Sequence, residues 1–98
     1  MMIEKAPDHF PNEVARVRAE ARGRGVRVEI CPRFEIGFRA GYHVALRREH
    51  EVAGRQSWSG WSDFVPADGP GVEFEERLRK RVEFGEERLA RIVRELEG

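Results

Sequence analysis

The stretch VRVEICPRFEIGFR, residues 26–39, decides the fold because its apolar side chains recur at every second position. These side chains are Val26, Val28, Ile30, Phe34, Ile36 and Phe38. A period of two is typical of strands that bury one face and leave the other in water. Proline cannot donate a backbone hydrogen bond to a neighbouring strand. The stretch therefore predicts two antiparallel strands with a break at Pro32.

The segment after this stretch fits two kinds of structure. Tyr42, Val44 and Leu46 continue the alternation beyond a turn at Ala40-Gly41, which predicts a third strand. Residues 42–53 also fit one face of a helix that would end at Gly54. The preceding alternation favours the strand.

Helical patterns occupy both ends of the chain. Phe10, Val14, Val17 and Ala21 are spaced by four, three and four, so with Pro11 at its start a helix is expected over residues 11–22. The turn-forming sequence PADGPG, residues 66–71, precedes a second, longer helix over residues 72–97. The apolar stripe of that helix comprises Phe74, Leu78, Val82, Gly85, Leu89, Ile92, Val93 and Leu96.

The predicted fold is therefore a single α+β domain over residues 1–98, in the order α-β-β-β-α. It has an N-terminal helix, a three- or four-stranded antiparallel sheet, and a long C-terminal helix packed across the sheet.

The length of the C-terminal helix suggests a binding surface. Residues 72–97 would span about 39 Å, whereas a compact domain of this size has a diameter of about 32 Å. Either the helix breaks or kinks at Gly85, or its distal half extends past the sheet and is covered by a protein target or a second copy. The residues predicted to bind protein are Trp61, Phe84, Leu89, Ile92, Val93 and Leu96.

Charge and composition argue against several classes of partner. The 98 residues carry 18 basic and 18 acidic side chains, so the chain has no global field that would draw it to nucleic acid or to an anionic membrane. One cysteine, Cys31, cannot form an internal disulfide. No secretion signal or membrane-length apolar run is present, and we expect a cytoplasmic protein.

Catalytic and metal-binding motifs are missing or incomplete. His50-Glu51 begins like the HExxH zinc motif, but Gly54 stands where the second histidine is required. The remaining histidines and Cys31 have no partners at ligand spacing. "ARGRGVR", residues 21–27, lacks the frame and the lysine of a phosphate-binding loop. We expect no enzyme activity, no cofactor and no metal.

Both tryptophans lie in SWSGWSDF, residues 57–64. Trp58–Ser62 matches the WSxWS signature of cytokine receptors, but the helical patterns at both ends exclude their seven-stranded sandwich. If the segment is extended, the two rings point to opposite faces. We predict that Trp58 is buried in the core and that Trp61 is presented near arginines.

The element order resembles that of double-stranded RNA-binding domains. Nine arginines against three glutamates between Val14 and Arg48 would suit such a function. Those domains begin their last helix with phosphate-binding lysines, however, where this chain has Glu73, Glu75 and Glu76. Nucleic-acid binding is therefore the alternative, and it would use Arg16, Arg22, Arg24, Arg27 and Arg39.

The function expected from the sequence is non-catalytic protein binding by a regulator, adaptor or inhibitor that covers a surface of its target. Small chains of this kind include phage and mobile-element proteins that block host machinery. Self-association into a homodimer fits the same apolar residues.

Overall fold

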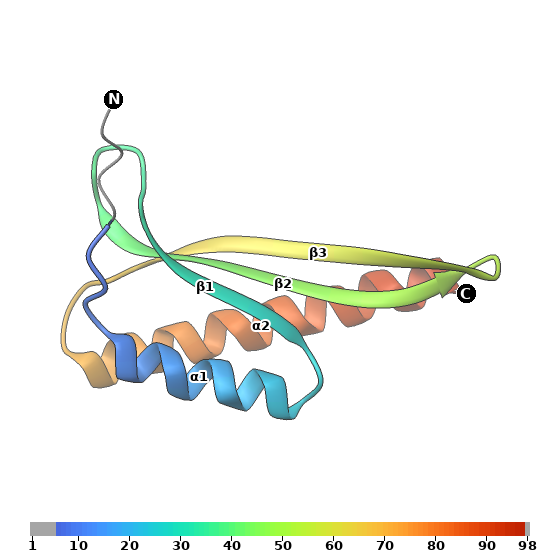
Figure 1. Cartoon of the computed structure of the whole chain (residues 1–98), viewed down its shortest axis with the longest axis horizontal. Coiled ribbons are helices and arrows are strands. Elements are labelled where there is room, and N and C mark those ends of the chain that lie inside the picture. The colour runs from blue at the N-terminus through green and yellow to red at the C-terminus, as the bar shows by residue number, and fades with distance from the viewer. Residues whose placement is uncertain (1–5, 98) are drawn as a thin grey trace.

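The computed structural model describes residues 6–97 and confirms the order α-β-β-β-α (Figure 1). The elements are α1 (Pro11–Gly23), β1 (Arg27–Phe34), β2 (Ala40–Val52), β3 (Arg55–Pro66) and α2 (Gly71–Glu97). The three strands form one antiparallel sheet in the order β1-β2-β3. Neither helix within residues 6–97 is long and apolar enough to cross a membrane.

Pro32 lies within β1, so the predicted break is wrong. The strand runs to Phe34, and Pro32 pairs with Tyr42 of β2. Alternate residues of an edge strand direct their backbone groups away from the sheet. Pro32 occupies such a position, as does Ile30, whose carbonyl accepts a hydrogen bond from Arg18 of α1 (3.0 Å) instead of from a strand. The missing N–H of Pro32 therefore costs no ladder hydrogen bond.

The turn between the first two strands lies at residues 35–39, and not at Ala40-Gly41. The Phe38 N–H donates to the Glu35 carbonyl (2.9 Å), and Gly37 has a φ of 91° that favours glycine. Ile36 and Phe38 were expected on a buried strand face, but both are exposed at the tip of this turn. Figure 1 shows the turn standing away from both helices.

Residues 42–53 form the strand rather than the alternative helix. β2 has 13 residues and pairs with β3 through a two-residue turn at Ala53-Gly54, where both φ values are positive. Such a turn matches the natural twist of a hairpin. The segment that contains both tryptophans is therefore the third strand of the sheet.

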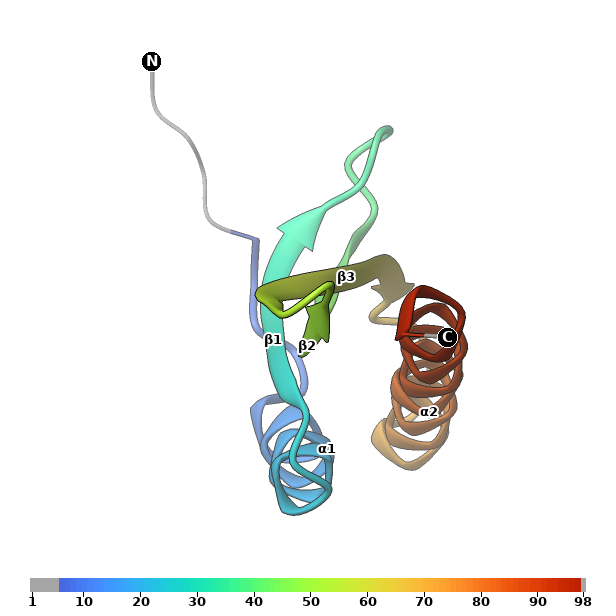
Figure 2. The same ribbon diagram turned by 90° about the vertical axis from the view of Figure 1, so that its right-hand side faces the viewer.

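Both helices pack on one face of the sheet. In Figure 2, α1 lies below β1 and α2 runs beside β3; α1 packs against β1 and α2, and α2 packs against β2 and β3. Valine, leucine, isoleucine and aromatic side chains from all five elements form the core between them. The core residues are Val14, Val17, Ala21, Val28, Ile30, Tyr42, Val44, Leu46, Val65, Phe74, Leu78, Val82 and Leu89.

The long helix is covered by an equally long hairpin. α2 has 27 residues and spans about 40 Å, and strands of 12 and 13 residues reach about the same length. The expected overhang assumed a compact sphere, whereas the molecule measures 43 × 35 × 18 Å. Leu89 and Val93, predicted to bind a partner, are buried by the chain itself, and α2 continues through Gly85 without a break.

Ion pairs join α1 to α2 at the surface. Arg79 donates to Glu20 (2.8 Å) and to Glu75 (2.7 Å), and Arg16 also donates to Glu75 (2.8 Å). These hydrogen bonds lower the pKa of both carboxyl groups below their usual range. A lowered pKa stabilises the fold above the unfolded-state pKa, and this contribution is lost as pH falls through the folded-state pKa.

Tyr42 ties the segment before α1 to the sheet. Its side chain is buried, its hydroxyl donates to Asp8, and the Phe10 N–H donates to the hydroxyl oxygen (2.8 Å). Burial first, and then the hydrogen bond to Asp8, raise the pKa of Tyr42 to about 12. The neutral phenol therefore stabilises the fold fully below the unfolded-state pKa, and this stabilisation is lost as pH rises through the folded-state pKa.

We expect a direct signature of this environment in an alkaline titration. Tyr42 is the one tyrosine in the sequence, so the ultraviolet absorbance of tyrosinate reports this residue alone. The midpoint should lie near pH 12 in the folded protein and near pH 10 in urea. A folded-state midpoint at the ordinary value would contradict the buried hydroxyl.

Candidate protein-binding surface

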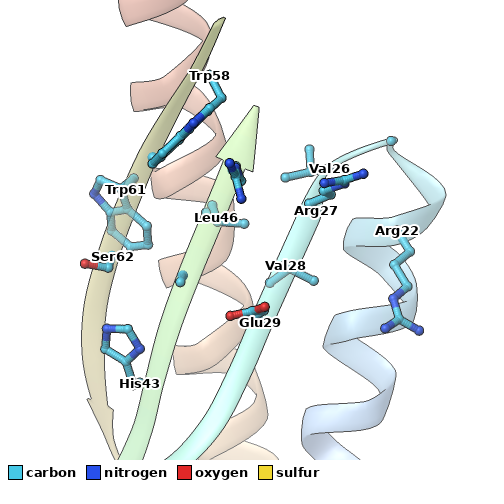
Figure 3. Close-up of a pocket in the computed structure, with 14 residues that line it drawn as sticks. Arg22, Val26, Arg27, Val28, Glu29, His43, Leu46, Trp58, Trp61 and Ser62 are labelled. Atoms are coloured by element: carbon cyan, nitrogen blue, oxygen red, sulfur yellow. The ribbon is translucent and has the colours of Figure 1, made fainter. Parts of the chain in front are cut away.

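The outer face of the sheet is not covered by any helix of the described chain. Small side chains at its centre, including Ala45, Gly60 and Ser62, leave a concave region of about 800 Å³. Figure 3 shows residues that line it, with His43 and Trp58 on the strands and Arg22 at the end of α1. The region continues around the start of β1 to Val26 and Val28.

Trp58 is the large aromatic residue of this outer face. It is 57% exposed, and the guanidinium carbon of Arg47 lies 4.0 Å from the centre of its ring. Stacking of this kind holds an exposed ring in one orientation at a modest gain in energy. The prediction that Trp58 belongs to the core is therefore wrong.

Trp61 points to the opposite, inner face. It pairs with Leu46, packs against the core, and its ring lies 6.1 Å from that of Phe84 in an edge-to-face arrangement. The separation of three residues correctly places the two tryptophans on opposite faces of the strand, but it cannot tell which of them faces the helices. The register with β2 decides this, because Leu46 is an inner-face residue.

One edge of the sheet presents unpaired backbone groups. A two-residue hairpin turn makes Val52 and Arg55 a hydrogen-bonded pair, and such pairs recur at every second position. The odd-numbered residues of β3 therefore bond to β2. The even-numbered residues, namely Gln56, Trp58, Gly60 and Ser62, direct their N–H and C=O groups to the free edge.

We call residues 56–62 the β3 window, and its C-terminal end is closed by side chains. The Phe64 N–H, which also points outward, donates to Asp63 Oδ1 (2.8 Å). Pro66 has no N–H, and its carbonyl accepts from Arg77 (3.0 Å). Within residues 6–97, no hydrogen bond from another element reaches the backbone between Gln56 and Ser62.

The window also lacks charge, although 37% of the chain is charged. Its sequence, QSWSGWS over residues 56–62, has no acidic or basic side chain. Natural proteins usually protect long edge strands with charges, prolines or covering elements. The other edge of the sheet has such protection, because β1 contains Pro32 and receives Arg18 from α1.

One flank of α2 extends the surface below this edge. Phe84 is 44% exposed and Ile92 is 37% exposed, and Arg88 lies between them on the same side of the helix. Leu96 is half-exposed one turn beyond Ile92. We define the edge surface as the β3 window together with Phe84 and Ile92.

The predicted protein-binding residues thus fall into two groups. Phe84, Ile92 and Leu96 are accessible, whereas Leu89 and Val93 belong to the interior and Trp61 is half-buried between the sheet and α2. Sequence reasoning missed Trp58 and the β3 edge. The uncharged run between Gln56 and Ser62 was the signal that could have revealed them.

Several arginines predicted for nucleic-acid binding are paired with carboxylates. Arg16 pairs with Glu75, Arg24 with Glu86 and Arg39 with Asp68. Arg27 lies 3.8 Å from Glu49, and Arg22 lines the concave region. Carboxylates beside these guanidinium groups compete with phosphates, so the arrangement weighs against the nucleic-acid alternative.

No cluster of three or more potential metal ligands occurs in the part of the chain that is described, and Cys31 is an exposed free thiol on the outer face. The sequence matches no family model, and no curated protein or solved structure is significantly similar to the chain. The surface itself is therefore the basis for any statement about function.

Proposed function

We propose that this chain is a non-catalytic protein-binding module that contacts its partner through the edge surface. A strand added to an open sheet edge gains backbone hydrogen bonds, and alternate side chains supply specificity. The observation that supports the proposal is the unpaired, uncharged β3 window beside an exposed tryptophan. Tryptophan is among the residues most often found at the energetic centre of protein interfaces.

Binding of this kind is the physical means by which a small regulator, adaptor or inhibitor covers a surface of its target. The partner's strand would lie along Gln56–Ser62, and apolar side chains on its inner side would meet Phe84 and Ile92. The Arg47–Trp58 stack would remain on the outer face, where the partner's strand pairs with β3.

Site-specific photocrosslinking tests this proposal. A photoreactive benzoyl-phenylalanine is placed at Ser62, on the open edge, and in a matched variant at Arg33, which is exposed on the protected β1 strand. Both variants are expressed in cells that produce the protein naturally and are irradiated. We expect protein adducts from position 62 and few from position 33.

The masses of the adducts identify the class of partner. Adducts twice the mass of the chain indicate self-association, and adducts of other masses indicate a different protein. An absence of adducts at position 62, or equal yields at both positions, would contradict binding at the β3 edge.

A further inference from the structure

The open window of β3 is complementary to itself. Antiparallel strands exchange hydrogen bonds between residues whose backbone groups point to the seam. If Ser59 of one chain lies opposite Ser59 of another, Gln56 pairs with Ser62 and Trp58 pairs with Gly60. This register uses all four outward-facing residues of both chains, which amounts to about eight hydrogen bonds because each of the four pairs exchanges two.

The side chains fit the same register. Trp58 falls opposite a glycine, so no side chain of the other copy crowds its ring. On the inner face, Arg55 falls opposite Asp63 at each end of the seam, which places opposite charges together. The pairs formed there are Ser59 with Ser59 and Ser57 with Trp61.

Other registers leave some of the outward-facing backbone groups of the window without a partner or bring bulky side chains together. Moving the centre to Gly60 places Gln56 opposite Phe64, whose N–H already donates to Asp63. Moving it to Trp58 places the two bulky rings directly opposite each other and removes Ser62 from the paired strands. The register centred on Ser59 is therefore the one that the capped Phe64 end and the hairpin turn at the other end permit.

We infer that the partner at the β3 edge is a second copy of this chain, joined antiparallel with Ser59 on the two-fold axis. This inference rests on the proposed function and names its partner. The product is a continuous six-stranded sheet with the helices of both copies on one side and an uncovered outer face on the other. Phe84 of each copy lies below the seam beside Trp61.

A cysteine scan tests the register directly. In a Cys31→Ser background, Ser59→Cys should form an intermolecular disulfide under mild oxidation. Directly opposed residues that are not hydrogen-bonded lie about 4.5 Å apart between Cα atoms, which suits a disulfide. Ser57→Cys is the matched control, because the two copies of residue 57 would be about 13 Å apart along the seam.

Sedimentation measures the association itself. The chain of 11.3 kDa should sediment with twice that mass. Ser62→Pro removes an outward N–H but no bond to β2, so we expect about tenfold weaker dimerisation or more with an unchanged circular dichroism spectrum. Ser62→Ala should dimerise like the natural chain.

Each result decides the matter. A Ser59-selective disulfide with a proline-sensitive dimer supports the inference. A monomeric chain, or equal crosslinking at positions 57 and 59, overturns it. If the monomer nevertheless gives adducts with another protein from position 62, the protein-binding proposal stands and only the second copy is rejected.

Discussion

Replacing Phe74 by alanine is expected to lower the free energy of unfolding by about 3–5 kcal/mol, the usual loss for a buried aromatic side chain. Phe74 is fully buried at the start of α2. Its ring stacks on Phe10 at a centroid distance of 4.5 Å and lies 5.3 Å from that of Tyr42. The substitution therefore opens a cavity where the sheet, α2 and the segment before α1 meet.

Urea denaturation followed by circular dichroism measures this loss, at one fixed protein concentration for all variants because self-association would change the apparent stability. Val72→Ala is the matched control, since Val72 is largely exposed two residues away on the same helix. It should change the stability by less than about 0.5 kcal/mol. Losses of similar size in both variants would contradict this placement of Phe74.

The element types followed from the sequence because hydrophobic periodicity reports burial. Alternation predicted strands around residues 26–46, and the stripe from Phe74 to Leu96 predicted the long helix. Periodicity shows which side chains share a face, but it does not show which residues direct their backbone N–H and C=O groups to a neighbouring strand. For this reason the sequence could not show that Pro32 lies harmlessly on the outward side of β1 or that the turn lies at Gly37.

The candidate surface also depends on the direction of the backbone groups in each strand. The two-residue turn at Ala53-Gly54 decides which backbone groups of β3 face solvent, and the pairing of Trp61 with Leu46 decides which tryptophan is buried. Both are properties of the paired hairpin, and neither can be read from β3 alone. The length of that hairpin also explains why α2 needs no partner to bury Leu89 and Val93.

Gly85 is required in the middle of α2 because Trp61 packs directly on the helix backbone there. A β-carbon at this position would lie closer than van der Waals contact to the Trp61 ring and to Leu46 Cδ1. Alanine normally stabilises a helix by about 1 kcal/mol relative to glycine. Here the steric overlap of the new methyl group with Trp61 and Leu46 should outweigh that gain. We expect Gly85→Ala to destabilise the protein by about 1–3 kcal/mol.

A double-mutant cycle isolates this contact. Trp61→Ala alone should cost about 3 kcal/mol, because the half-buried ring fills the space between β3 and α2. In that background Leu46 can move into the vacated volume, so Gly85→Ala should cost at least about 1 kcal/mol less than it does in the natural chain. Gly23→Ala at the end of α1 is the control, since nothing lies within 4 Å of the methyl group that it adds. Additive losses at positions 61 and 85, or stabilisation by Gly85→Ala, would show that the ring does not rest on the helix at this glycine.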